Sequence, residues 1–365
     1  MTKDKITTKD LSKAATAARW KYRGDGKTQQ EIAGLMGISQ AEVARYLKLA
    51  REANIIRIEV DPHFTVDLKQ KLMETFPHLR EVIIVPIAGI PEERSDLLLS
   101  ELGTECAHYF RTTVRHNAMI GVSGGETINS FIRSIGRFRD QDFSLPVACR
   151  IYPLVILLTA EVIAITPAAL VANFVSCLPD SRGKAFQLPS VITGGRRNVS
   201  VANIYKENPE IKALNSEIEH LGYYFVGIGC IDYSGRARHI RNAREISTHL
   251  FNSLIRDFNL LPALKKYNAK GECLNQPFDE NGNFLTAKSE LEPLRNFSLA
   301  LPADTLSSHV EKQTANVVGV AGGLVKHEAV HAALRAKIFN VLITDSLTVE
   351  YVLKAEGRLT TDTTE

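Results

Sequence analysis

Residues 28–53, TQQEIAGLMGISQAEVARYLKLAREA, decide how the N-terminal part of this chain folds. Thr28 and Glu31 have the spacing of a capping box, in which a hydroxyl and a carboxylate satisfy free backbone amides at a helix start. The helix that they open ends at Gly37, a residue that readily adopts the left-handed conformation of a sharp turn. Ser39 then opens a second capping box and a second helix. Two short helices joined by a glycine turn are typical of a helix-turn-helix.

Apolar residues at helical spacing predict one inner face for each of these two helices. An alanine-rich helix over residues 11–22 precedes them, and residues 55–60 alternate as a strand does before Pro62 closes the module. We therefore expect residues 1–62 to form a helix-turn-helix DNA-binding domain. The predicted inner positions are Ile32, Leu35 and Met36 on the first helix and Val43, Tyr46, Leu47 and Ala50 on the second.

Positive charge is concentrated in this first module. Residues 1–60 contain 12 Lys and Arg against 7 Asp and Glu, whereas the whole chain of 365 residues has a net charge of +3. A basic module on a near-neutral remainder fits contact with the phosphates of DNA. A merely solvated basic surface on a helical hairpin is the alternative.

The N-terminal part of the second helix is the part that enters the major groove in a helix-turn-helix. Gln40, Ala41 and Arg45 occupy this part of the helix and are predicted to face base edges, where Gln can pair with adenine and Arg with guanine. Other polar residues nearby are placed for phosphates. The predicted DNA-binding residues are Gln29, Ser39, Gln40, Ala41, Arg45 and Lys48.

The rest of the chain alternates short apolar runs with helix-compatible segments. Runs rich in Val, Ile and Leu between helices predict a mostly parallel, doubly wound sheet, so the fold class is α/β. We expect an effector-binding and oligomerisation domain at residues 63–358 and a disordered tail at residues 359–365. The predicted strands cover residues 81–87, 118–123, 152–158, 224–229, 316–321 and 340–345.

The apolar stretch of residues 151–175 raises the question of a membrane span. Glu161 interrupts it, and Pro153 and Pro167 would break a continuous helix, so we expect a buried strand followed by a helix that begins near Pro167. The N-terminus has no apolar core of a signal peptide, and five widely spaced cysteines indicate no disulfide framework and no zinc site. We expect a cytoplasmic protein without a membrane partner, metal or cofactor.

Two glycine loops follow predicted strands and carry the candidate ligand-binding groups. The first glycine loop, residues 121–127 (GVSGGET), lets backbone amides and hydroxyls approach an anion at a helix N-terminus. The second glycine loop, residues 321–326 (AGGLVK), ends in a lysine suited to a phosphate or a sugar oxygen. Tight turns, a solvated lysine and loop-capping carboxylates are the structural alternatives. The candidate effector-binding residues are Gly121, Ser123, Gly125, Thr127, Asp232, Gly322, Gly323, Lys326 and Asp345.

These motifs, taken in order, resemble the SorC/DeoR-type sugar-binding transcriptional regulators. Family landmarks are matched by residues 39–60 (SQAEVARYLKLAREANIIRIEV), the first glycine loop, residues 227–232 (GIGCID), residues 278–282 (FDENG) and residues 317–345. The resemblance implies a domain related to sugar-phosphate isomerases and an effector, often a phosphorylated sugar. It implies that the first glycine loop, Asp232, Lys326 and Asp345 hold this effector, that the chain forms dimers or tetramers, and that effector binding changes how the DNA readers are presented.

The chain departs from the family pattern at three places. Residues 158–161 (LTAE) replace a common Gly-Gly loop, Gly124 replaces a bulkier residue, and Asn275 stands where glycine is common. Because Glu161 would repel a phosphate if it faced the crevice, a sugar, a sugar phosphate and a polyol all remain candidate effectors.

The leading hypothesis is a regulator of carbohydrate or polyol catabolism genes that binds double-stranded operator DNA. The alternative is a sugar-phosphate isomerase-like enzyme with an N-terminal helical extension, and a pure scaffold protein is a third possibility. An isomerase needs a positioned acid and base. No such pair is evident in the sequence, so we expect a non-enzymatic regulator.

Overall fold

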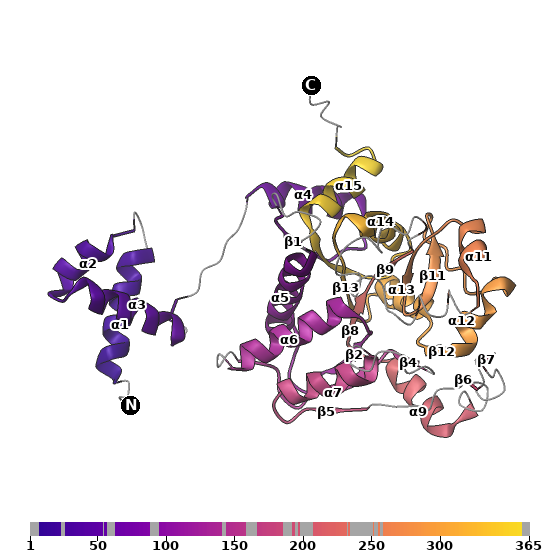
Figure 1. Ribbon diagram of the computed structural model, residues 1–365, viewed down its shortest axis with the longest axis horizontal. Coiled ribbons are helices and arrows are strands. Elements are labelled where there is room, and N and C mark those ends of the chain that lie inside the picture. The colour runs from indigo at the N-terminus through magenta and orange to yellow at the C-terminus, as the bar shows by residue number, and fades with distance from the viewer. Residues whose placement is uncertain are drawn as a thin grey trace. The chain divides into compact units, whose positions relative to one another are not determined.

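The computed structural model divides the chain into two compact units, Met1–Asp61 and Pro62–Glu365, drawn in Figure 1. Within them the structure describes residues 7–22, 26–53, 55–56, 63–87, 95–140, 144–157, 166–184, 192–193, 196–197, 207–231, 233, 251, 255 and 258–359. We call the two parts the N-terminal unit and the C-terminal unit and describe each by itself.

Three helices form the N-terminal unit: α1 (Thr8–Tyr22), α2 (Gln29–Met36) and α3 (Gln40–Glu52). Both predicted capping boxes are confirmed. At α2 the N–H of Glu31 donates to Thr28 Oγ1 at 3.2 Å, and Glu31 Oε2 accepts from the N–H of Thr28 at 2.7 Å. Ser39 and its N3 partner repeat this arrangement at α3. Gly37 lies between the helices with φ 61°, the left-handed turn that the sequence predicts.

The small core of the N-terminal unit confirms the inner face of α3 but not all of α2. Ile32 is fully buried and Met36 packs partly against the core, whereas Leu35 is 57% exposed, so its predicted inner position was wrong. Because a helix turns about 100° per residue, Ile32, Ala33 and Met36 lie on one side of α2, and Leu35 points away from the middle of that side. Residues 55–56 form no strand, and residues 57–60 of the predicted strand lie outside the described residues.

A seven-stranded sheet in the order β1-β14-β13-β8-β2-β3-β5 is the centre of the C-terminal unit. Every neighbouring pair in it is parallel. The strands are β1 (Glu81–Val85), β2 (Met119–Val122), β3 (Arg150–Pro153), β5 (Arg182–Gly183), β8 (Tyr223–Gly227), β13 (Asn316–Val320) and β14 (Val341–Asp345). The prediction of a mostly parallel α/β sheet is confirmed.

Helices cover both faces of this sheet, as expected of a doubly wound fold (Figure 1). One apolar cluster joins a sheet face to α5 (Ser95–Thr113), α6 (Glu126–Asp140) and α7 (Pro167–Cys177). The other cluster joins the opposite face to α4 (His63–Thr75), α9 (Pro209–Ile218), α13 (Ala303–Lys312), α14 (His327–Arg335) and α15 (Ser346–Ala355). Side chains of a strand alternate between the two clusters, so both faces of the central strands are buried.

The predicted strand at residues 152–158 is two strands. β3 ends at Pro153, and β4 (Val155–Leu157) leaves the sheet to pair antiparallel with β12 (Ser298–Ala300). Proline has no N–H to continue a ladder, and the chain changes partner at the following residue, Leu154. The predicted helix at Pro167 is confirmed by α7, whose first turn is capped by Thr166.

Shorter elements complete the C-terminal unit. β9 (Gly229–Cys230), β10 (Ala269–Cys273) and β11 (Gln276–Asp279) make a small antiparallel sheet. The others are β6 (Ile192–Thr193), β7 (Arg196–Arg197), α11 (Leu261–Lys266), η5 (Ser289–Leu291), α12 (Glu292–Phe297) and η6 (Leu324–Lys326). Among the described residues, no helix combines the length and apolar character needed to cross a membrane.

Candidate functional site

The outer face of α3 is the candidate DNA-binding surface. Ala41, Arg45 and Lys48 follow one another at four- and three-residue spacing, which places them in one stripe, and all three are exposed. Gln40 is exposed beside them at the first position of the helix. The opposite face carries the buried residues of the core, so packing fixes which side of α3 is presented to solvent.

Arg45 is held by the aromatic residue next to it. Its Nη2 lies 3.3 Å from Tyr46 Oη as a hydrogen-bond donor, and its guanidinium carbon is 4.9 Å from the centre of the Tyr46 ring. Such a cation–π contact reduces the conformations open to a long side chain. Arg45 is therefore partly ordered before any partner arrives.

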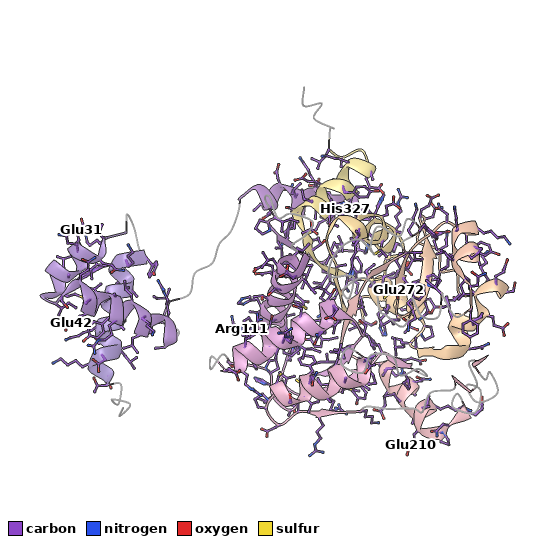
Figure 2. All side chains as sticks on the ribbon, viewed as in Figure 1. Glu31, Glu42, Arg111, Glu210, Glu272 and His327 are labelled. Carbon is purple, nitrogen blue, oxygen red and sulfur yellow. The ribbon has the colours of Figure 1, made fainter. Side chains whose placement is uncertain are left out.

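Ser39 and Gln29 have structural roles besides the phosphate contacts predicted for them. Ser39 Oγ accepts from the N–H of Glu42 at 3.2 Å and donates to Glu42 Oε2 at 2.8 Å. The hydrogen bonds from Ser39 lower the pKa of the Glu42 carboxyl, labelled in Figure 2. Gln29 is half-buried at the first position of α2. Contact of either residue with DNA stays a prediction.

In the C-terminal unit, the carboxyl ends of β14, β13, β8 and β2 lie side by side in the sheet. Ligands bind outside the carboxyl ends of strands in open α/β folds. The first glycine loop follows β2, and the second glycine loop follows β13. The structure thus brings the two loops to one edge, and we call this edge, where the sequence predicts that the effector binds, the effector crevice.

Ser123 ties the first glycine loop to the end of β8. Its Oγ accepts a hydrogen bond from the N–H of Gly227 at 3.1 Å, and its own N–H donates to the carbonyl of Phe225 at 3.0 Å. Gly125 has φ 101°, a conformation that favours glycine, and Thr127 is buried in the first turn of α6. These contacts hold the loop in a fixed shape at the N-terminus of α6.

Gly121, a predicted effector contact, lies inside β2 and has a packing role. A Cβ at this position would stand 2.4 Å from Leu154 Cδ2 and 2.8 Å from Leu221 Cδ1. The absence of a side chain therefore makes room for two leucines of the core. A direct contact of Gly121 with an effector stays a prediction.

The second glycine loop is fastened to β14 through Asp345. The fully buried Asp345 caps α15, and a Cβ at Gly322 would stand only 2.3 Å from its Oδ2. Gly323 has φ 95°, a conformation that favours glycine, so the structure explains why both positions of this pair are glycine. This places the backbone of the loop at the crevice.

Glu272 is a candidate site residue that sequence reasoning missed. It is 4% exposed on β10, opposite Gly229 of β9, and its carboxyl fills the space that a Cβ at Gly229 would need. Figure 2 labels this glutamate. Burial raises the pKa of this carboxyl to about 7, and the nearby ammonium of Lys326 acts in the opposite direction. The sequence offered no local signal for it, because the strand reads AKGEC and carries a lysine as well as the glutamate.

Lys326 and Glu272 lie close enough for the charge of each to shift the pKa of the other. Burial lowers the pKa of the Lys326 ammonium, while Cys230 and Glu272 beside it raise it. The adjacent His327 is buried against the ring of Tyr351 at 5.1 Å between centroids, and burial lowers the pKa of its imidazole. A buried carboxyl and a half-buried ammonium beside the loop backbone can bind a polar ligand that replaces their lost water.

The structure does not describe every residue that the sequence analysis singled out. Asp232 lies outside the described residues, as do Glu161 and the rest of residues 158–161. Asn275 is buried with φ 62°, the left-handed turn expected of a residue that replaces glycine. Its N–H donates to Glu272 Oε2 at 2.8 Å, so this turn helps to position the buried carboxyl.

Comparison with known proteins identifies the larger unit first. Residues 60–354 match the family described as "Putative sugar-binding domain". The chain is 24% identical over 347 residues to the transcriptional regulator LsrR of Enterobacter sp. (strain 638), a match that covers 93% of this chain and 92% of that protein. A shorter match, 30% identical over 122 residues and 37% of the relative's length, is to the transcriptional regulator YjhU of Escherichia coli K12.

Solved structures share the fold. The full-length sorbitol operon regulator SorC from Klebsiella pneumoniae has a TM-score of 0.64 at 21% identity and covers 95% of this chain and 100% of its own. A DeoR family regulator from Listeria monocytogenes has a TM-score of 0.57 at 22% identity and covers 79% of this chain and 99% of its own. With the family match over most of its length, the chain belongs to the sugar-binding family of SorC/DeoR-type transcriptional regulators.

Proposed function

We propose that the protein controls genes of carbohydrate or polyol catabolism by binding operator DNA through α3 and a small carbohydrate through the effector crevice. The observation that carries the proposal is the meeting of two glycine loops at the carboxyl ends of four neighbouring strands, with the buried Glu272 and the half-buried Lys326 beside them. The exposed stripe of Ala41, Arg45 and Lys48 supports the DNA-binding half. Such a DNA-binding role places the protein in the cytoplasm.

Each part of the crevice suits a different group of the ligand. The N-terminus of α6 with Gly125 and Thr127 favours a phosphate or another anionic group. Lys326 can donate to the same group or to a sugar hydroxyl, and Glu272 can accept from hydroxyls. In the proposed site, these groups act together with Gly121, Ser123, Asp232, Gly322, Gly323 and Asp345.

Binding without turnover is part of the proposal. The carboxylate of Asp345 accepts hydrogen bonds from Gly323 and from Thr348, so it is engaged in holding the fold. An isomerase needs an acid and a base positioned together, and Asp345, committed to these hydrogen bonds, cannot serve as the partner of Glu272. We further propose that the C-terminal unit forms dimers or tetramers, because two recognition helices in one assembly can read two half-sites.

The test combines ligand and DNA binding by the full-length protein. A thermal-shift screen against sugars, sugar phosphates and polyols should identify a compound that raises the unfolding midpoint, because a ligand of the native state stabilises it. That compound should then change the affinity for an operator selected from random DNA. Lys326→Gln should weaken the ligand response at least tenfold, whereas Lys354→Gln, an exposed lysine on α15, should not. Turnover of a sugar phosphate, or no selected operator, would contradict the proposal.

A further inference from the structure

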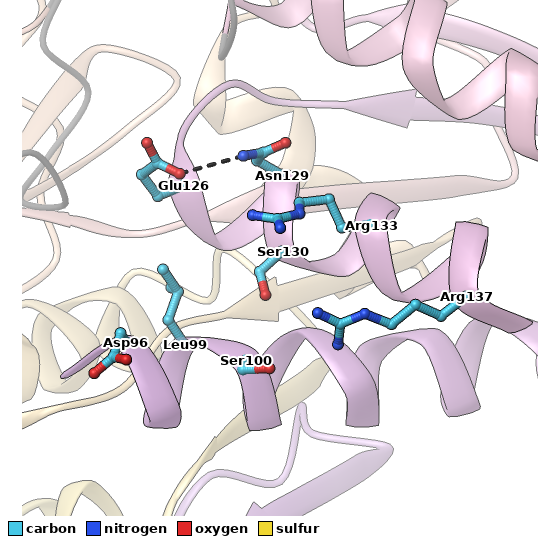
Figure 3. A pocket seen from close by; sticks show the side chains of 8 residues that line it. All are labelled: Asp96, Leu99, Ser100, Glu126, Asn129, Ser130, Arg133 and Arg137. Atoms are coloured by element: carbon cyan, nitrogen blue, oxygen red, sulfur yellow. Dashed lines mark hydrogen bonds between the residues drawn. The ribbon is translucent and has the colours of Figure 1, made fainter. Parts of the chain in front are cut away.

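A pocket of about 230 Å³ lies between α5 and α6, on residues that the effector crevice does not use (Figure 3). Asp96, Leu99 and Ser100 line it from α5, and five residues of α6 line the other wall. A hollow of this size has room for a small molecule. The pocket is therefore a candidate small-molecule site.

Two guanidinium groups line this pocket, Arg137 at one end and Arg133 nearer the middle, and both residues are exposed. Arg133 and Arg137 are four residues apart on α6, and Figure 3 shows both side chains reaching toward the space between the helices. Among the residues that the structure describes, neither has an ion-pair or hydrogen-bond partner. Arginine forks bind carboxylates and phosphates in two-point contacts, so this end of the pocket suits an anionic group.

Carboxylates lie at the other end. Glu126 and Asp96 come from the first turns of α6 and α5, and Glu126 Oε2 accepts from Asn129 Nδ2 at 3.3 Å. A doubly charged inorganic ion would meet repulsion here, whereas hydroxyl groups would find acceptors. The charge distribution selects a ligand with an anionic group at one end and hydrogen-bond donors along the rest.

Serine side chains line the pocket where the two helices approach closely. A Cβ at Gly103 would stand 2.5 Å from Ser130 Oγ, so the glycine lets α6 lie against α5 and leaves the serine hydroxyl at the contact. The hydroxyls of Ser100 and Ser130 in the pocket lining fit a polyhydroxylated molecule better than an apolar one.

We propose that this pocket binds a small hydroxy acid, with its carboxylate between Arg133 and Arg137 and its hydroxyls toward Ser100, Asn129 and Glu126. The site is distinct from the effector crevice. It adjoins it through α6, whose first residue directly follows Gly125, so a bound acid would hold the helix that presents the first glycine loop.

The experiment is calorimetric titration of the full-length protein with gluconate, with acetate and glucose as probes that carry only the carboxylate or only the hydroxyls. Gluconate should bind saturably and at least tenfold more tightly than either fragment. The double variant Arg133→Gln/Arg137→Gln should raise the dissociation constant of gluconate at least tenfold. Ser100→Phe, which fills the pocket from α5 and keeps both charges, should do the same.

Two control variants separate this site from its surroundings. Arg115→Gln removes an exposed arginine elsewhere in the C-terminal unit, and Lys326→Gln alters the effector crevice, so both should leave the gluconate constant within twofold of the parent value. Equal binding by the parent and the double variant, or loss of binding in Lys326→Gln alone, would overturn the proposal. Absence of saturable gluconate binding at matched ionic strength would overturn it as well.

Discussion

The carboxylate of Asp345 accepts a hydrogen bond from the backbone N–H of Gly323 at 2.6 Å and joins the ends of two neighbouring strands. Its oxygens also accept from the N–H of Thr348 at 2.9 Å and the Oγ1 of Thr348 at 2.6 Å. One buried side chain thus caps α15 and shapes the second glycine loop. Its effect on an effector is therefore expected to pass through the loop backbone.

Asp345→Asn should destabilise the C-terminal unit by about 1–3 kcal/mol, because an amide cannot accept all three hydrogen bonds at a fully buried position. Urea unfolding monitored by circular dichroism measures the loss. Thr348→Val, which removes only the hydroxyl donor, should cost less, about 1 kcal/mol. An Asp345→Asn variant as stable as the parent would show that the carboxylate does not hold the loop.

Glu272 should make stability depend on pH. Because burial raises its pKa from 4.5 to about 7, the folded chain keeps a proton that the unfolded chain has released. The stabilisation from this group is therefore fully present below about pH 4.5 and is lost as the pH rises through about 7.

Glu272→Gln, which stays neutral throughout, should remove this dependence. Between pH 4.5 and 8 the parent should lose on the order of 2–3 kcal/mol of unfolding free energy relative to the variant. Urea titrations at several pH values measure the difference. The exposed Glu328→Gln serves as the control, and parallel pH profiles of the parent and Glu272→Gln would refute the prediction.

Ser39→Ala should destabilise the N-terminal unit by about 1 kcal/mol, because it removes the hydroxyl from both cap hydrogen bonds at the start of α3. Ser39→Asp should restore most of the loss, since a carboxylate also accepts from the N–H groups of the first turn. Thermal unfolding of the N-terminal unit within the full chain tests this. A loss that Asp does not rescue would assign the hydroxyl another role.

Arg45 and Lys48 should affect DNA binding differently. Arg45→Ala should weaken binding to the preferred operator by about 1–3 kcal/mol and relax base preference at one position. Lys48→Ala should weaken binding to all sequences alike and reduce the slope of log affinity against log salt by about 1. Gel-shift titrations at several salt concentrations separate the two. Equal losses on operator and random DNA for Arg45→Ala would contradict its assignment to a base.

Local signals predicted the parts of the fold that depend on neighbours in sequence. The caps at Thr28 and Ser39 and the start of α7 at Pro167 each depend on residues within one turn, so the sequence alone predicts them. The prediction for Leu35 failed because helical spacing alone does not show where Ala33 meets the core. The end of β3 at Pro153 was missed because an apolar run does not reveal a change of strand partner.

The candidate site was predictable where it lies on loops next to strands, and not where it depends on pairing across the fold. The two glycine loops were located by their position after apolar runs. Glu272 was missed because its burial follows from the pairing of β10 with β9, whose residues are about 40 positions earlier in the chain. No local pattern announces that a glutamate will share a space with Gly229.

β14 occupies an interior place in the sheet, between β1 and β13, although it is the last strand of the chain. Because parallel pairing with β1 joins residues some 260 positions apart, a ribosome must release nearly the entire polypeptide before the sheet can close. Until then β1 lacks its partner and β13 is paired only with β8, so both strands have an open edge that invites aggregation. Synthesis cut short before residue 341 should therefore yield an insoluble product, with no partly active regulator left in the cell.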